Sequence, residues 1–187
     1  SGIAPKKANF EFFESKNIDK IDLTTPHSVT IPGALDAWKT IHDEHGKLDF
    51  EELFLSSINY ADNGYKVTKK VSEAWEKSFK KLNNHKITKN LYLKNGKVYK
   101  NNELRKNIPL ANTLKLIKKN GIKEFYQGSI AEDMVESLNE IGGLHSIEDF
   151  SIQKTLKSKT ISSNFKDMSV HQCPPNGPGV TVLLMLK

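Results

Sequence analysis

Two histidines three positions apart, His42 and His45 in the stretch HDEH, are the first residues whose types and spacing suggest chemistry. Imidazoles at i and i+3 lie on one side of a helix, and imidazole is a frequent zinc ligand. Zinc-binding helices of hydrolases instead space their histidines four apart, and no third ligand follows nearby. We therefore interpret the pair as solvated side chains at a helix end. The sequence predicts no metal site and no cofactor.

Carboxylates in pairs are the second candidate, since two of them can divide general acid and general base work. Asp43 and Glu44 form one pair, and Glu51 and Glu52 form another. Both pairs fall on helix surfaces or first turns. Acidic side chains in a first turn are explained by the helix dipole, so we expect no catalytic role for these four residues.

The chain has one cysteine, Cys173, and His171 lies two positions before it. Alternate residues of a strand share a face, so an imidazole could lower the pKa of the thiol. A proline turn, CPPNGPG, follows and offers no further partner, which leaves a catalytic cysteine as the minor interpretation. Gly177 and Gly179 do not form a phosphate-binding loop, because a proline separates them and the loop lysine is missing.

Charge and composition narrow the function classes. The 187 residues carry a formal net charge of +6, but the lysines are spread along the chain and form no basic stripe with aromatic partners. We expect a solvated lysine-rich surface and no nucleic-acid partner. A mean hydropathy of -0.52 and the absence of an apolar run near ~20 residues predict a soluble protein with no membrane segment. No signal peptide is visible, and the sequence does not choose between cytoplasm and periplasm.

The elements that position these residues are mostly helices. Apolar residues at helical spacing predict five of them, in the ranges 34–45, 50–63, 68–82, 109–120 and 129–141. Asp49 with Glu52 is expected to cap the second helix, and Ser146 to cap a short later turn. The side chains that we expect to be buried on the apolar faces are Trp38, Phe54, Ile58, Trp75, Leu114, Met134, Val135 and Leu138.

Two hairpins complete the prediction. Asn95-Gly96 stands between short apolar runs in LYLKNGKVY, which is the strongest local signal for a tight hairpin. SKTISSNFKDMSVHQCP is expected to form two strands around Ser163-Asn164. The fold class is therefore mainly α with small β-hairpins, and we treat residues 1–187 as a single helix-rich segment.

Three stretches in order resemble the gamma-glutamyltranspeptidase family. They are VTIPGALDAWKTIHDEHGKLDFEELFLSSINYADNGYKV, PLANTLKLIKKNGIKEFYQGSIAEDMVESLNEIGGLHSIEDF and CPPNGPGVTVLLML. The family belongs to the N-terminal nucleophile hydrolases, which have an αββα fold. The resemblance implies that this chain is a helix-rich internal segment of the large subunit.

The chemistry that the resemblance implies lies outside the chain. In the family, the precursor cuts itself, and a threonine at the new N-terminus of the small subunit attacks an amide carbonyl, with its own α-amine as base. That threonine is expected after Lys187. Thr24, Thr25, Thr30 and Thr181 are not at a chain N-terminus and do not replace it. The implied partners are the rest of the large subunit and the small catalytic subunit, and self-association is expected to cover apolar surface exposed in a fragment.

Two departures concern the substrate. Transpeptidases of the family carry Arg-Glu-x-Ala-Pro, whose arginine holds the substrate α-carboxylate, whereas this chain begins Ser1-Gly2-Ile3-Ala4-Pro5. Ser1 thus takes the place of the arginine and cannot form a bidentate pair with a carboxylate. The turn CPPNGPG is more similar to the amidohydrolase and acylase-type relatives. The implied substrate is a small amide, with a gamma-glutamyl group in doubt.

Three interpretations remain open from the sequence. The first is a segment of an amide hydrolase or acyltransferase, and the second is a catalytically dead relative that serves as a binding or scaffold module. A threonine at a cleavable junction beyond Lys187 would favour the enzyme. The third, a basic nucleic-acid-binding domain, predicts salt-dependent retention on heparin and DNA.

Overall fold

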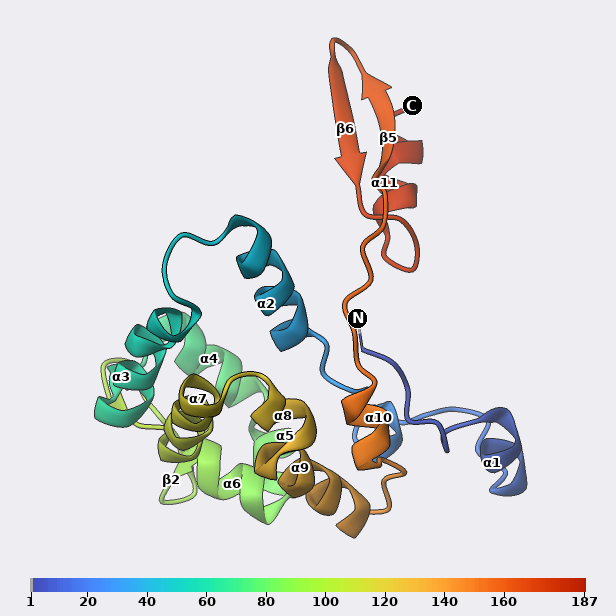
Figure 1. The fold of residues 1–187 in the computed structure, drawn as a ribbon. Coiled ribbons are helices and arrows are strands. Elements are labelled where there is room, and N and C mark those ends of the chain that lie inside the picture. The colour runs from blue at the N-terminus through green and yellow to red at the C-terminus, as the bar shows by residue number, and fades with distance from the viewer. Residues whose placement is uncertain (1) are drawn as a thin grey trace. The chain divides into compact units, whose positions relative to one another are not determined.

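The computed structural model describes residues 2–187, drawn in Figure 1. These residues form two compact units, one that ends at Gln153 and one that begins at Lys154. The sequence pattern did not indicate this division.

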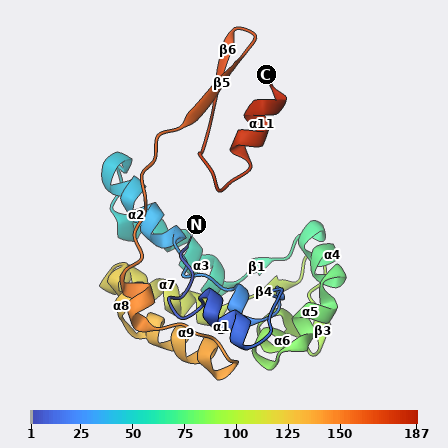
Figure 2. The same ribbon diagram turned by 90° about the vertical axis from the view of Figure 1, so that its right-hand side faces the viewer.

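Short helices make up most of the first unit. Its α-helices are α1 (Phe10–Ser15), α2 (Ala34–His45), α3 (Leu55–Asn63), α4 (Lys69–Lys77), α5 (Phe79–Asn84), α6 (Lys86–Tyr92), α7 (Ile108–Asn120), α8 (Lys123–Gln127), α9 (Ser129–Glu140) and α10 (Ile147–Ser151). Two 3-10 turns, η1 (Pro26–Ser28) and η2 (Phe50–Phe54), lie between them. Helices α4, α5 and α6 gather at one side of the unit, on the right in Figure 2. The predicted helix-rich class is confirmed.

Glycines end three helices where the sequence predicted. Gly46, Gly64 and Gly121 follow α2, α3 and α7. Gly64 and Gly121 have φ angles of 95° and 75°, a region that costs a side chain energy but glycine little. These ends are therefore fixed by local backbone chemistry.

Two helix predictions need correction. The predicted helix 50–63 begins as the 3-10 turn η2, and the Asp49 side chain makes no capping hydrogen bond to it. The predicted helix 68–82 is interrupted at Ser78, where the backbone leaves helical geometry between α4 and α5. Helix α6 was not predicted, because its run of polar residues carries little apolar periodicity.

A single apolar core organises the first unit. Its buried members come from residues far apart in the chain and include Ile31, Leu35, Phe50, Phe54, Ile117, Tyr126, Ile130, Ala131 and Phe150. Ile31 and Phe150 are 0% and 1% exposed, and Phe50 and Phe54 pack edge to face with ring centroids 5.1 Å apart. This core joins α2, η2, α7, α8, α9 and α10 to the segment that contains Ile31.

The burial predictions are right for one residue, half right for six and wrong for one. Phe54 is buried, whereas Ile58, Trp75, Leu114, Met134, Val135 and Leu138 are partly buried. Trp38 is 59% exposed, which contradicts its predicted burial. Its helix, α2, buries Leu35 in the core and rests His42 on Phe50, whereas the Trp38 side chain points away from these contacts. Figure 1 shows α2 rising from the other helices of this unit.

The predicted hairpin at Asn95-Gly96 is confirmed. Strands β2 (Leu93–Lys94) and β3 (Lys97–Val98) pair antiparallel. Asn95 and Gly96 both have positive φ, 52° and 75°, as a two-residue turn between twisted strands requires. A second pair, β1 (Tyr65–Lys66) with β4 (Leu104–Arg105), was not predicted.

The second unit has a hairpin and a helix. Strands β5 (Ile161–Phe165) and β6 (Met168–Gln172) pair antiparallel, and α11 spans Gly179–Met185. The strand pair is as predicted, but its turn is at Lys166-Asp167, and Lys166 adopts the positive φ of 53°. Ser163 and Asn164 lie within β5 opposite Val170 and Ser169, so the predicted turn position is wrong.

Within residues 2–187, none of the helices has both the length and the apolar character needed to cross a membrane.

Candidate functional site

Ser1, the predicted substrate-binding residue, lies outside the described residues. The site is therefore built from the segment that follows it, Gly2 to Lys6, and from the side chains that fix this segment. All of them belong to the first unit.

Backbone pairing fixes the start of the segment. The Ile31 N–H donates to the Ile3 carbonyl oxygen at 2.8 Å. A Cβ at Gly2 would lie 1.5 Å from the Ile31 carbonyl oxygen, so only glycine permits this approach. Because Ile31 is fully buried in the core, it gives the segment a rigid support.

The other end of the segment is held by Asp149. Its Oδ1 accepts the Lys6 N–H at 2.9 Å, across 143 positions of the chain. Its Oδ2 accepts the Ser146 N–H and the Ser146 hydroxyl, each at 3.0 Å. Asp149 is only 3% exposed. A buried carboxylate must have such donors, because an unpaired charge inside a protein is costly.

The same contacts begin helix α10. The Ser146 hydroxyl accepts the Asp149 N–H at 3.3 Å, so the serine and the aspartate form a reciprocal capping box. The prediction that Ser146 caps this turn is confirmed. The contact of this aspartate with Lys6 was not predicted.

His145 links the loop before α10 to the segment that contains Ile31. It is 4% exposed, and its Nε2 lies 2.9 Å from the Val29 carbonyl oxygen. A carbonyl only accepts, so Nε2 is the donor, and the buried Nδ1 has no hydrogen-bond partner. The contact ties Val29 to the loop before α10, two residues before the backbone pair at Ile31.

The two candidate metal ligands on α2, His42 and His45, have different surroundings. His42 Nε2 lies 2.7 Å from the Leu48 carbonyl oxygen, and its ring packs edge to face on Phe50. The His45 side chain is 76% exposed. Among residues 2–187, no three His, Cys, Asp or Glu side chains gather as a metal-binding group.

The candidate carboxylates lie on the surface. Asp43 forms an ion pair with Lys39 one turn earlier on α2, and Glu51 and Glu52 are exposed in the first turn of η2. Glu51 and Glu52 at the start of η2 agree with the dipole explanation, whereas Asp43 and Glu44 lie in the last turn of α2, where the dipole does not favour a carboxylate.

Cys173 is exposed and follows Gln172, the last residue of β6. The argument that alternate strand residues share a face therefore does not extend from His171 to Cys173. Thr24, for which no catalytic role is expected, donates through both its N–H and its hydroxyl to Asp22 Oδ1 at 2.7 Å. These bonds lower the pKa of Asp22 and define a turn.

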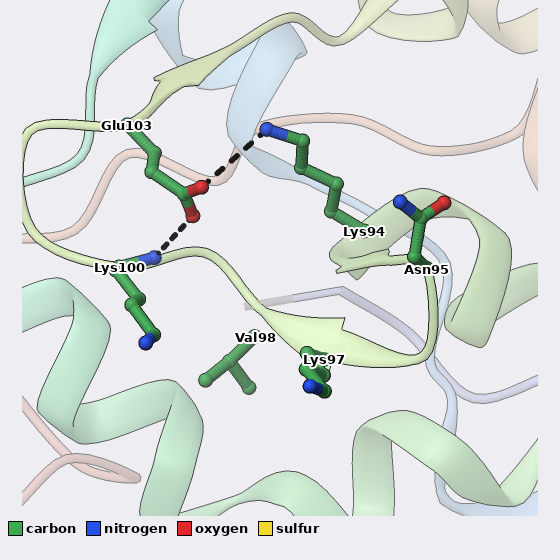
Figure 3. A pocket seen from close by; sticks show the side chains of 6 residues that line it. All are labelled: Lys94, Asn95, Lys97, Val98, Lys100 and Glu103. Atoms are coloured by element: carbon green, nitrogen blue, oxygen red, sulfur yellow. Dashed lines mark hydrogen bonds and ion pairs between the residues drawn. The ribbon is translucent and has the colours of Figure 1, made fainter.

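A cavity of about 290 Å³ lies beside the β2–β3 hairpin (Figure 3). Its lining residues are Lys94, Asn95, Lys97, Val98, Lys100 and Glu103. Glu103 accepts the Lys100 N–H at 2.7 Å and pairs with Lys94 at 3.4 Å. The Lys100 bond is the main cause of the lowered pKa of Glu103. Because these neighbours already satisfy the carboxylate, the cavity offers no free acid–base pair.

Solved structures share this fold. The gamma-glutamyltranspeptidase of Helicobacter pylori superposes with a TM-score of 0.89 at 23% identity, over 98% of this chain and 54% of that one. The cephalosporin acylase of Bacillus halodurans gives 0.86 at 23% identity, over 94% of this chain and 34% of that one. The helix-rich fold is therefore that of the transpeptidase and acylase class.

The chain belongs to the gamma-glutamyltranspeptidase family, whose profile matches residues 1–187. The glutathione hydrolase-like YwrD proenzyme of Bacillus subtilis is 31% identical over 85% of this chain. The capsule biosynthesis protein CapD proenzyme of Bacillus anthracis is 32% identical over 87% of it. These matches cover 30% and 29% of the relatives' own lengths. The resemblance found in the sequence is confirmed.

Proposed function

We propose that the chain is part of the large subunit of a gamma-glutamyltranspeptidase-like amide hydrolase or acyltransferase. The observation that carries the proposal is the family match over residues 1–187. The nucleophile is a threonine freed at the N-terminus of a small subunit encoded after Lys187. Both relatives described above are named proenzymes, which supports a precursor that is cleaved.

In that reaction, this chain helps to position the substrate and does not supply the nucleophile. The described residues assemble no nucleophile with a base and an orienting group, whereas the segment Gly2–Lys6 is held at both ends by buried partners. The partners are the rest of the large subunit and the small catalytic subunit. Exposed apolar side chains on α2, such as Trp38 and Ile41, suit burial against such a partner.

The substrate is a small acyl amide, and a gamma-glutamyl group is a poor fit. Ser1 stands where transpeptidases of the family carry the carboxylate-binding arginine. Loss of a buried, charge-assisted contact typically costs ~2–5 kcal/mol of binding. We therefore expect simple acyl amides to compete well with gamma-glutamyl amides.

The test uses the full-length parent protein. It should mature into two subunits, and replacing the threonine at the new N-terminus by alanine should leave an uncut precursor. The mature enzyme should hydrolyse simple acyl anilides at least tenfold more efficiently than gamma-glutamyl p-nitroanilide, because each 1.4 kcal/mol of lost binding is tenfold. Efficient gamma-glutamyl transfer would refute the substrate assignment, and a parent that neither matures nor turns over any amide would refute the enzyme itself.

The 187-residue chain alone should give only background release from both anilides. Oxyanion donors and the nucleophile would both have to come from elsewhere in the parent protein. Ser1→Ala and Cys173→Ala are the controls, since these are the terminal hydroxyl and the single thiol. Turnover that copurifies with the chain and disappears in either variant would place the chemistry within these residues.

A further inference from the structure

We propose that residues 66–106, which we call the basic lobe, are a docking surface for an anionic lipid bilayer. The lobe contains helices α4, α5 and α6 and the β2–β3 hairpin, which gather at one side of the first unit (Figure 2). Docking is peripheral, through lysine side chains and exposed apolar side chains, and it needs no helix that spans the bilayer.

The net charge of the chain is divided unevenly. Residues 66–106 contain thirteen lysine and arginine residues but only three glutamates, a formal charge of +10, whereas the whole chain carries +6. The rest of the chain is therefore net acidic, at -4. All twelve lysines of the lobe are exposed, and its arginine, Arg105, is buried. An anionic partner is therefore attracted to this side of the first unit.

Few of these charges are paired within the chain. Among the described residues, two lysines of the lobe form ion pairs, Lys69 with Glu73 at 3.9 Å and Lys94 with Glu103 at 3.4 Å. Both lysines are exposed, and an ion pair in solvent is weak. Lysine is seldom buried without an acidic partner. We therefore expect the other lysines of the lobe to stay in contact with solvent in the parent protein.

An exposed phenylalanine lies among the lysines at the break between α4 and α5. Phe79, the first residue of α5, is 37% exposed. It lines a cavity of about 600 Å³ together with Lys77, Lys80 and Lys81. Three cations around an aromatic side chain suit a membrane interface, where the lysines meet phosphate groups and the ring enters the acyl boundary.

A second exposed apolar side chain belongs to α6. Ile87 is 62% exposed and lines a cavity of about 400 Å³ that it shares with Ile108, itself 44% exposed, and with Lys106. The cavity beside the β2–β3 hairpin adds the lysines at positions 94, 97 and 100 (Figure 3). The lobe thus repeats one arrangement, an apolar side chain beside lysines, at separate places on its surface.

The aromatic rings of the lobe favour a bilayer over a nucleic acid as the partner. Proteins that bind single strands stack bases on accessible aromatic rings. Trp75 instead packs edge to face with Tyr92 and Tyr99, and Arg105 lies over Trp75 and Tyr92. Arg105 is buried as well, so the side chain type that most often reads guanine is not presented.

The test measures cosedimentation of the full-length parent protein with lipid vesicles. One set contains phosphatidylcholine alone, and the other contains about one third phosphatidylserine. The protein should bind the anionic vesicles and not the neutral ones, and about 0.5 M salt should release it because salt screens exposed charges. Equal binding to both sets, or binding to neither, would overturn the proposal.

A triple variant assigns the binding to the lobe: Lys77→Gln, Lys80→Gln and Lys81→Gln. Each lysine near an anionic bilayer contributes about fivefold to binding, so the triple variant should bind at least about tenfold more weakly. The matched control removes three exposed lysines outside the lobe, in the combined variant Lys47→Gln, Lys119→Gln and Lys123→Gln. An equal loss in the two triple variants would contradict a localised docking surface.

Ile87→Gln separates a bilayer from other polyanions, because only a bilayer offers an apolar phase for this side chain. It should weaken binding to anionic vesicles about fivefold and leave any binding to duplex DNA unchanged. Ile141→Gln, at a position that is 52% exposed and outside the lobe, is the matched control and should change vesicle binding by less than about twofold. Undiminished vesicle binding in Ile87→Gln, with duplex DNA displacing the protein from the vesicles, would assign the lobe to a nucleic acid and overturn the proposal.

Discussion

Two buried ionic side chains in the first unit, Asp149 and Arg105, have their charges stabilised by different kinds of contact. Asp149, 3% exposed, accepts hydrogen bonds from the Lys6 N–H and from two donors of Ser146. Arg105, 4% exposed, has its guanidinium 5.1 Å from the ring centroids of both Trp75 and Tyr92. One charge is met by directed donors and the other largely by aromatic faces.

The hydrogen bonds of Arg105 reinforce that contrast. Its Nη1 donates to the Tyr65 hydroxyl at 3.1 Å, and its Nη2 donates to the Leu91 carbonyl at 3.2 Å. Both acceptors are uncharged, and the buried Nε has no hydrogen-bond partner. Aromatic faces attract a cation over a broad range of geometry, whereas a carboxylate fixes its donors within tenths of an ångström. Asp149 therefore fixes the backbone at Lys6 and Ser146. Arg105 mainly contributes packing volume and cation–π contacts to the cluster around Trp75.

The largest effect should come from emptying the Arg105 site. Arg105→Ala leaves a cavity beside the Trp75 and Tyr92 rings and removes the hydrogen bonds that Arg105 donates to the Tyr65 hydroxyl and the Leu91 carbonyl. We therefore expect about 3 kcal/mol lower unfolding free energy. Arg105→Met keeps an apolar stem against the rings and should cost roughly half as much. Urea unfolding followed by tryptophan fluorescence measures both.

An equal loss in the two variants would contradict this account of Arg105, because it would mean that the charge matters more than the volume. The matched control is Lys106→Met, an exposed cation at the next position. It should shift the unfolding free energy by no more than about 0.5 kcal/mol.

Glu124 is a less buried counterpart of Asp149. Its Oε1 accepts the Ser129 N–H at 2.9 Å and the Ser129 hydroxyl at 2.5 Å, and its Oε2 accepts from Asn120 at 3.0 Å. The bond from the Ser129 hydroxyl is the main cause of the lowered pKa of Glu124. A carboxylate whose pKa is lower in the folded state makes the unfolded state bind more protons, so stability rises with pH.

The stabilisation from Glu124 should be complete above its ordinary pKa of 4.5 and disappear as the pH falls through the lowered value. Urea unfolding of the parent chain and of Glu124→Gln between pH 6 and pH 3 tests this. The two curves should converge at the acid end. A constant offset between them across the range would show that the hydrogen bonds to Glu124 do not depend on its charge.

The smallest effect on stability should come from Trp38, which is exposed, whereas Trp75 is partly buried beside Arg105. Its indole is on the part of α2 that lies outside the core, so Trp38→Ser should change the unfolding free energy of the chain by less than about 0.5 kcal/mol. Trp75→Ser, which removes a face of the Arg105 cluster, should cost several times more. A large loss in Trp38→Ser would show that α2 packs more closely than described.

Local chemistry made part of this fold predictable. The glycine ends of α2, α3 and α7 and the turn at Asn95-Gly96 depend on neighbouring residues alone, and so does the serine cap of α10. Periodicity indicates which face of a helix is apolar, but not whether another element covers it. Trp38 was therefore predicted to be buried and is not.

The candidate site was less predictable for the same reason. The bond between Lys6 and Asp149 joins residues 143 positions apart, and Arg105 contacts Trp75 and Tyr92 from strand β4, which pairs with the distant β1. Nothing in the local pattern indicates such contacts. The family resemblance found the class of protein but gave Asp149 no role.

Arg105 is also the single arginine of the chain. A protease that cuts only after arginine therefore has one peptide bond to attack, and in the native protein that bond follows a buried side chain that contacts two aromatic rings. Cleavage requires the cluster to open, so its rate reports the population of the open form when reclosing is fast. Two fragments, 1–105 and 106–187, would then appear. Their rate of appearance would measure how often this cluster opens, without any label or probe.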